Sequence, residues 1–361
     1  MSPVPAPDPP LPDPSSARRR VDSVLAGFLD RKAATARDQQ LPVDAVESLA
    51  QFTASGGKRL RPMLCLAGWH AAGADPPPAS VIQVAAALEM FHASALIHDD
   101  VMDDSPTRRG RLTVHQSLRG RHSTPGGTET ARRFGTCAAI LVGDLALSFS
   151  DELIHTAGLT AAQFAALLPL LDAMRAEVMY GQYLDLAVTG QPTDDVDHAL
   201  KIVRYKTAKY TVERPLHIGA ALAGGPPRLL EDLSRYALPI GEAFQLRDDL
   251  LGVFGDPAVT GKSRLDDLRE GKHTALVALA FRHADLRHAE LLHGLLGRAE
   301  LGEAEAAQIR VLLTPARARV EDMIRQRHAA AGHLLDTSTA IAAQVIPTLR
   351  RLAAAATRRA S

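Results

Sequence analysis

Most of the chain, from about residue 18 onward, is built from long segments in which apolar residues recur at helical spacing. Short stretches rich in glycine and proline separate these segments, at 55–57, 75–78, 124–127, 224–227 and 255–257. No internal repeat of fixed period and no linker between two domains is evident. The pattern therefore predicts about ten or more helices in a single all-α domain, with the main interruptions at 105–130 and 255–273.

The amino-acid composition supports this fold class. Of the 361 residues, 46% are hydrophobic, 23% are charged and only 4% are aromatic. Plentiful alanine and leucine favour helices over strands, and the apolar fraction excludes a disordered chain or a disulfide-stapled mini-protein. Cys65 and Cys137 lie far apart with no clustered histidine, so neither a disulfide framework nor a zinc site is expected, and a reducing, cytoplasmic location is favoured.

Charge balance and the N-terminal segment narrow the possible partners. Lys plus Arg and Asp plus Glu each total 41, so no overall basic field attracts nucleic acid or an anionic membrane. No uninterrupted apolar stretch reaches the roughly 18 to 20 residues of a membrane span. Residues 1–17 are rich in proline, have no apolar periodicity and do not look like a signal peptide, so a disordered tail is expected before a domain at 18–361.

A first acidic cluster stands at the predicted C-terminus of a helix. The apolar pattern of ALEMFHASALIHDDVMDDSP ends in four carboxylates, including Asp99, Asp100 and Asp103, just before Pro106. The helix dipole favours cations at this end, and Asp99 and Asp103 repel each other one turn apart. A bound divalent ion such as magnesium would resolve the conflict. The alternative, which the segment alone leaves open, is a solvated acidic helix end.

A second acidic cluster is predicted near the end of a later helix. Asp248 and Asp249 follow an apolar helical pattern, one turn after Gln245. Two aspartate pairs facing each other across a cavity would hold the divalent ions that a diphosphate needs before its bond to carbon breaks. Lys262 and Lys272, each preceded by glycine, have the flexible backbone that lets an ammonium approach a phosphate.

Basic groups accompany the acidic clusters. Guanidinium groups bind phosphate oxygens in a bidentate fork, and each lone basic residue has a plain surface charge as its alternative. The candidates are Lys58 and Arg61 after Gly56-Gly57, and the pair Arg108-Arg109. His92, two helical turns before Asp99, is either a ligand contact or a core histidine. No nucleotide-binding glycine loop is present.

Two further polar insertions interrupt apolar helices. They are Lys206-Thr207 in IVRYKTAKYT, and Gly181-Gln182 with Asp185 in EVMYGQYLDL. Buried polar groups need partners, and a bound substrate is one such partner.

Taken in order from about Ser55 to Thr274, these motifs resemble the trans-isoprenyl diphosphate synthases, also called polyprenyl synthetases, and most resemble geranylgeranyl diphosphate synthases. The matching motifs are GGKRLRP, DDxxD at 99–103, RRG, LVGD, GQxxD, KT, FQLRDD and the two Gly-Lys dipeptides. The resemblance implies an isoprenoid synthase helical bundle around a central cavity, usually a homodimer. It also implies magnesium-assisted condensation of isopentenyl diphosphate with allylic diphosphates.

The resemblance assigns roles to individual residues. Magnesium, as three ions in the closed complex, would be bound by Asp99, Asp103 and Asp248, supported by Asp100 and Asp249. The allylic diphosphate would be contacted by Arg108, Lys206 and Lys262, with Lys272 as a further substrate-binding residue. Isopentenyl diphosphate would be held by Lys58, Arg61, His92 and Arg109. Thr207 and Gln245 would stabilise the allylic cation.

The second acidic motif departs from the family's common DDxxD. Gly252 stands where the third carboxylate belongs, and Asp256 follows four residues later. We therefore expect a raised magnesium requirement, and Gly252→Asp is expected to lower the magnesium concentration needed for half activity.

Product length follows from the helix before the first cluster. A chain growing toward the N-terminus of that helix would meet the small residues Ala95 and Ser94 and then Phe91, about 12 Å along the axis from Asp99 at 1.5 Å per residue. With Phe91 as the floor, the main product is predicted to be geranylgeranyl diphosphate (C20).

Two alternatives were weighed. A class I terpene cyclase also carries an acidic cluster, but its second metal motif differs from the DDLLGVFGD found here, and Lys58, Arg61 and Arg109 indicate a second substrate. A regulatory subunit of a heteromeric prenyl synthase would be expected to lack the first acidic cluster, which is intact.

Overall fold

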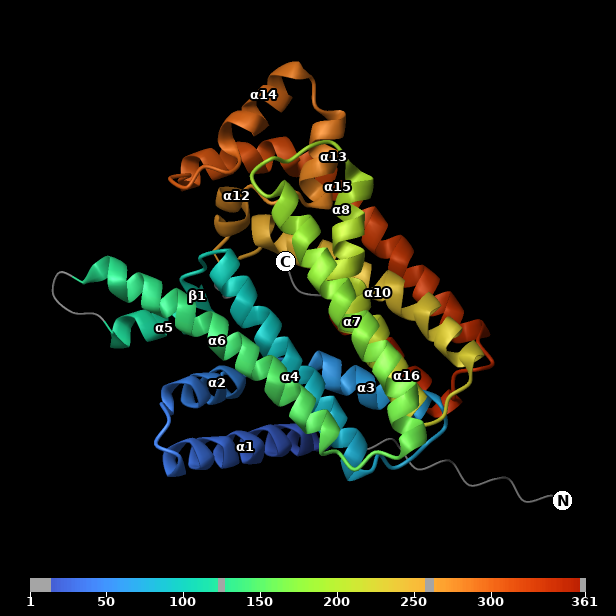
Figure 1. Cartoon of the computed structure of the whole chain (residues 1–361). Coiled ribbons are helices and arrows are strands. Elements are labelled where there is room, and N and C mark those ends of the chain that lie inside the picture. Colours follow the sequence, from blue (N-terminus) through green and yellow to red (C-terminus); the bar gives the residue numbers. More distant parts are fainter. Residues whose placement is uncertain (1–13, 123–126, 257–262, 358–361) are drawn as a thin grey trace.

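The computed structural model describes residues 14–122, 127–256 and 263–357. Its helices, in chain order, are α1 (Pro14–Asp38), α2 (Asp44–Ala54), α3 (Leu60–Ala71), α4 (Ala79–Met102), α5 (Val114–Arg121), α6 (Thr128–His155), α7 (Ala161–Val188), α8 (Val196–Ile202), the π-helix η1 (Val203–Glu213), α9 (Arg214–Leu222), α10 (Pro227–Phe254), α12 (Asp266–Glu270), α13 (Ala275–His283), α14 (Leu286–Leu295), α15 (Glu303–Thr337), the 3₁₀-helix η2 (Ala343–Val345) and α16 (Ile346–Thr357). Figure 1 shows these helices packed as one bundle. The all-α prediction is confirmed.

Element boundaries differ from the sequence prediction at three places. Helix α1 begins at Pro14, so residues 14–17 belong to a helix and not to the predicted tail, whose residues 1–13 lie outside the described part of the chain. The predicted loop 105–130 contains α5, because Val114 and Leu118 form a buried pair one turn apart. The predicted loop 255–273 contains the short helix α12.

A two-residue hairpin follows the first acidic cluster. Strands β1 (Thr107–Arg108) and β2 (Arg111–Leu112) pair antiparallel, with Arg108 opposite Arg111. Arg109 and Gly110 form the turn, and both have positive φ angles, of 54° and 73°. A turn with two such residues matches the twist of paired strands, which explains the glycine at the second position. The hairpin directs Arg108 back toward the helix that precedes it.

Helix α4 is the central helix of the N-terminal half and packs against α1, α3 and α6. It is buried on nearly every side, by residues that include Val84, Leu88 and Met90. Among the described helices, α4 alone is long and apolar enough to cross a membrane by length and composition, and 72% of that apolar window is buried inside the structure. Such a helix is typical of the core of a large bundle.

Two glycines let neighbouring helices approach η1 closely. A Cβ atom on Gly181 of α7 would lie 2.3 Å from the backbone nitrogen of Lys206, and one on Gly241 of α10 would lie 2.5 Å from the Cα of Ala208. Neither position has room for a side chain. Since π-helices are rare and concentrate at functional sites, this close packing marks the segment that carries Lys206 and Thr207.

Candidate active site

The first acidic cluster and Arg108 form one ion-paired group. Arg108 donates from Nε to Asp100 at 2.7 Å and from Nη2 to Asp99 at 3.2 Å. Asp103 caps the C-terminus of α4. Burial raises the pKa of Asp100 to about 6, despite the opposing effect of Arg108. Burial also acts to raise the pKa of Asp99, but Lys206 and Arg108 outweigh it and lower that pKa.

Lys206 joins the first acidic cluster to α7. Its ammonium lies 2.6 Å from a carboxylate oxygen of Asp185 and 3.3 Å from Asp99. Burial acts to lower the pKa of Lys206, yet the two carboxylates outweigh it and raise the pKa. Lys206 therefore carries a positive charge beside Asp99.

The second acidic cluster belongs to a hydrogen-bonded chain that begins in η1. Thr207 donates to the side-chain oxygen of Gln245 at 2.8 Å, and the Gln245 amide donates to Asp249 at 2.7 Å. Burial raises the pKa of Asp249 to about 8. Asp248, next to it on α10, is only half-buried. The polar atoms of Thr207 and Gln245 are thus fixed between η1 and the second acidic pair.

Lys272 lies between the two acidic clusters. Its ammonium contacts Glu270 at 2.9 Å and Asp267 at 3.1 Å. Burial acts to lower its pKa, but the carboxylates of Asp267, Glu270 and Asp103 outweigh this effect and raise the pKa well above the usual value. Because Asp103 of the first cluster acts on Lys272, and Lys272 acts on Asp249 of the second, Lys272 lies within electrostatic reach of both clusters.

The five aspartates do not form a ready-made metal site. Within the described ranges, no three His, Cys, Asp or Glu side chains are grouped closely enough to hold a metal ion. The predicted ligand set is therefore not preformed, because ammonium and guanidinium groups lie among these carboxylates. The donor set nevertheless suits a hard divalent cation, and the buried Oδ2 of Asp100 has no hydrogen-bond partner.

The predicted Gly252→Asp substitution meets a steric obstacle. Gly252 lies inside α10, which continues to Phe254. A Cβ atom at this position would lie 2.0 Å from a carboxylate oxygen of Asp267. A side chain at residue 252 therefore has no room unless Asp267 moves. Asp256, the substitute suggested by the sequence, lies beyond the helix and is exposed.

Arg61 and His92 meet at Tyr210 of η1. A hydrogen bond of 2.9 Å joins His92 Nδ1 to the Tyr210 hydroxyl. The guanidinium of Arg61 stacks 4.1 Å from the Tyr210 ring centre and donates to Thr211 at 2.6 Å. Burial, and then the charges of Arg61 and Arg109, lower the pKa of His92 well below its usual value, so this imidazole is neutral.

The remaining predicted diphosphate residues lie on the glycine loop or facing it. Arg109 donates to the carbonyl oxygen of Gly56, and a Cβ on Gly57 would lie only 3.0 Å from the Arg109 guanidinium. Arg109 and His92 line one small hollow together. Lys58 is exposed on the same loop. Lys262 lies outside the described residues.

The loop itself is anchored by Arg59, which the sequence analysis did not select. Arg59 has a φ of 49° and is buried. It donates to Asp22 at 2.7 Å, to Glu89 at 2.9 Å and to the carbonyl of Thr53 at 2.6 Å. These contacts fix the backbone between Lys58 and α3.

The predicted chain-length residues lie on α4. Phe91 and Ser94 are buried, whereas Ala95 is partly exposed. The Phe91 ring packs edge-on against Tyr210 at 5.8 Å.

Several functional candidates were missed at the sequence level. Tyr210 stands four residues after Lys206, and this helical spacing is the one sequence signal that places it near the site. Asp267, five residues before the selected Lys272, was given no role in the sequence analysis. The polar insertion at Asp185 was noticed, and the structure gives it Lys206 as a partner.

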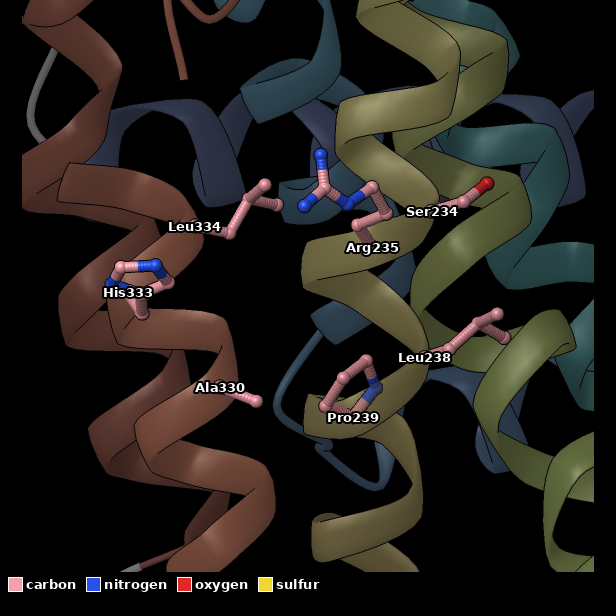
Figure 2. Close-up of a pocket in the computed structure, with 7 residues that line it drawn as sticks. All are labelled: Ser234, Arg235, Leu238, Pro239, Ala330, His333 and Leu334. Carbon is pink, nitrogen blue, oxygen red and sulfur yellow. The ribbon is translucent and has the colours of Figure 1, made fainter. Parts of the chain in front are cut away.

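A separate surface pocket of about 470 Å³ lies between α10 and α15. Figure 2 shows Arg235 and Pro239 on one helix facing His333 and Leu334 on the other. It contains none of the predicted site residues. The candidate active site is therefore the group of charged residues described above, which lies outside this pocket.

Comparison with known proteins decides the family. The model of the polyprenyl synthetase family matches residues 44–313, which include both acidic clusters and the arginine pair. This chain belongs to the polyprenyl synthetase family. Among its relatives are a geranylfarnesyl diphosphate synthase of Aeropyrum pernix, 35% identical over 64% of this chain and 68% of the relative, and a (2E,6E)-farnesyl diphosphate synthase of Mycobacterium tuberculosis, 37% identical over 63% and 57%.

Solved structures of similar proteins superpose on this chain over nearly its full length. A geranylgeranyl pyrophosphate synthase of Corynebacterium glutamicum, solved in complex with isoprenyl diphosphate and magnesium, is 40% identical and superposes with a TM-score of 0.91, covering 96% of this chain and 100% of that one. The polyprenyl synthetase studied here is thus an enzyme, a prenyltransferase with the isoprenyl synthase helical fold. Its relatives are named for products from C15 to C45, so membership leaves the chain length open.

Proposed function

We propose that this enzyme condenses isopentenyl diphosphate head to tail with allylic diphosphates of C5 to C15, giving mainly geranylgeranyl diphosphate and pyrophosphate. The observation that carries the proposal is the arrangement of two acidic clusters around the ammonium groups of Lys206 and Lys272, beside a separate group formed by Arg61, His92 and Arg109. Two anion-binding groups suit two diphosphate substrates.

Magnesium, found with the corynebacterial relative, would be held as three ions by Asp99, Asp103 and Asp248 with Asp100 and Asp249 in support, where it supplies positive charge to a departing diphosphate. Arg108 and Lys206, which now pair with Asp99, add positive charge to the same diphosphate.

The allylic cation needs stabilisation without capture. Thr207 and Gln245 hold their oxygen atoms in a fixed hydrogen-bonded chain. Fixed dipoles stabilise developing positive charge at no cost in reorganisation. The double bond of isopentenyl diphosphate then attacks the cation, and the released pyrophosphate accepts the proton that is lost.

Isopentenyl diphosphate is assigned to the arginine and histidine group. Arg61 retains a buried Nε without a hydrogen-bond partner in the described structure, so it has a donor to offer. His92 is neutral and therefore acts as a hydrogen-bonding group and not as a charge. Lys58 and Arg109 on either side of the glycine loop complete the set.

The C20 product is proposed because Phe91 is bulky and buried while Ser94 is small. Ser94→Phe is expected to shorten the main product, and Phe91→Ala to lengthen it. The measurement is the size of the dephosphorylated products by mass spectrometry. Unchanged product distributions in both variants would contradict the assignment of Phe91 as the floor.

We also propose that the enzyme is a homodimer and that it is located in the cytoplasm. Helices α6 and α7 carry exposed apolar residues at helical spacing, which are Phe134, Ile140, Leu141, Leu168, Met179, Tyr180, Tyr183 and Leu186. A stripe of this extent favours a second protein surface over water. Cys65 and Cys137 are both free thiols, in keeping with a reducing location.

The deciding experiment incubates the purified protein with magnesium, isopentenyl diphosphate and each of the C5, C10 and C15 allylic diphosphates. A ladder of prenyl alcohols ending at C20 after dephosphorylation is the expected result. A hydrocarbon formed from one substrate without condensation would assign the protein to the terpene cyclases and overturn the proposal.

A further inference from the structure

The third position of the second acidic motif has no side chain, but its space is filled. A Cβ on Gly252 would lie 2.0 Å from Asp267 Oδ2 and 3.1 Å from the carboxyl carbon of Asp267. The carboxylate of Asp267 therefore occupies the volume into which a side chain at residue 252 would extend. Gly252 is the residue that allows this approach.

The local fold holds Asp267 in this place. Asp267 lies in the first turn of the short helix α12, and Gly271 follows that helix with a φ of 64°. The next residue, Lys272, donates its backbone N–H to the Asp267 carbonyl at 3.1 Å and its ammonium to Asp267 Oδ1 at 3.1 Å. One carboxylate oxygen thus faces Lys272, and the other faces α10 at Gly252.

Asp267 also lies within electrostatic reach of the second acidic pair. Burial is the main cause of the raised pKa of Asp249, and the charges of Asp267 and Asp248 act in the same direction. A carboxylate that borders Gly252 and acts on Asp249 lies beside the space in which a third aspartate of this motif would place its oxygens.

We propose that Asp267 supplies the third carboxylate of the second metal-binding cluster in place of the side chain that Gly252 lacks. The inference deepens the proposed function and rests on it. Position 252 and position 267 are then alternatives, because the two side chains cannot both occupy the same volume. Hard divalent cations are bound through carboxylate oxygens, and their affinity depends on how many such oxygens converge.

The test measures metal-dependent stability and not turnover. Melting temperature is recorded while MgCl₂ is titrated at a fixed concentration of inorganic pyrophosphate, since a ligand that binds the folded state raises the melting temperature by mass action. Asp267→Asn is expected to raise the magnesium concentration for half of the shift by roughly tenfold or more, as is typical when a supporting group is lost from a metal site. Circular dichroism establishes that the variant is folded.

Glu270→Gln is the matched control. It removes the same charge and another partner of the same Lys272 ammonium, but it does not border Gly252. We expect it to change the half-shift concentration less than about twofold, well below the effect at a metal-supporting group. Equal effects of the two variants, or no effect of Asp267→Asn, would overturn the proposal.

An exchange of positions tests the proposal in the opposite direction. Gly252→Asp alone is expected to lower stability and to weaken the magnesium response, because the new Cβ collides with Asp267. The double variant Gly252→Asp with Asp267→Ala is expected to recover the response in part. A lower magnesium requirement in Gly252→Asp alone would overturn the role of Asp267.

Failure of this inference is distinguishable from failure of the proposed function. If the wild-type protein responds to magnesium and pyrophosphate but condenses no substrates, the proposed function is wrong and the proposed metal-binding cluster is retained. If the wild-type protein shows no such response, the proposed metal-binding cluster is wrong, and so is the role of Asp267.

Discussion

At the scale of single residues, Tyr210 connects two groups that were predicted separately. Its hydroxyl bonds to His92, and its ring supports the guanidinium of Arg61. Neither contact was visible in the sequence, because 118 residues separate His92 from Tyr210. Tyr210 is therefore a positioning residue for the proposed isopentenyl diphosphate site.

Tyr210→Phe removes only the hydroxyl and retains the ring under Arg61. Loss of one hydrogen bond is worth about 0.5–1.5 kcal/mol, so the KM for isopentenyl diphosphate is expected to rise roughly two- to tenfold. The KM for the allylic diphosphate should stay unchanged, and steady-state kinetics with each substrate varied in turn measures both.

Tyr205→Phe is the control for this prediction, since Tyr205 belongs to the same π-helix but its ring lies near Lys209, 5.9 Å from the ammonium. A similar rise in KM in both variants, or a rise for both substrates in Tyr210→Phe, would argue for a general loss of structure.

At the scale of elements, η1 is fixed by glycines and ion pairs together. Arg214, the first residue after η1, forms a two-bond ion pair with Glu177 of α7 at 2.7 and 2.6 Å, and Lys209 contacts the same carboxylate at 3.0 Å. Gly181, four residues after Glu177, brings the α7 backbone against Lys206. The position of Lys206 thus depends on the packing of two elements.

Gly181→Ala is expected to destabilise the fold by about 1–3 kcal/mol, the usual cost of overpacking, and to lower kcat because Lys206 is displaced from Asp99. Urea unfolding and steady-state kinetics measure the two effects. Gly332→Ala in α15 meets nothing within 4 Å and is the control. It should leave kcat unchanged and stability equal or slightly higher, because alanine favours a helix.

Elements were easier to predict from sequence than contacts between them. The apolar pattern identified α4 and α10 because each is long and carries acidic residues near its C-terminal end. It missed α5 and α12, which are short and depend on tertiary packing. Among the site residues, those in contiguous motifs were found, whereas Asp267 required knowledge of which side chain faces Gly252. No spacing in one sequence encodes that contact.

At the scale of the whole molecule, α6 and α7 lie at the near side of the bundle in Figure 1 and carry the exposed apolar stripe. Leu141 is 67% exposed and Tyr183 is 72% exposed. A monomer with so much apolar surface is disfavoured in water. The proposed dimer would bury it.

The double variant Leu141→Lys with Tyr183→Lys is expected to sediment as a monomer, whereas the wild type is expected to sediment as a dimer. Analytical ultracentrifugation measures the mass directly. Leu286→Lys on α14 is the control, because Leu286 is 84% exposed but lies outside the stripe. A wild type that sediments as a monomer would contradict the dimer.

The ammonium groups among the carboxylates also couple the binding of metal to the binding of diphosphate. Lys206 and Lys272 already neutralise the acidic clusters, so a metal ion must compete with them for the same oxygens. A diphosphate gives the displaced ammonium groups a new partner, and each ligand thereby lowers the free energy needed to bind the other. Metal and substrate affinity are reciprocally linked, and the enzyme should take up both together far more readily than either alone.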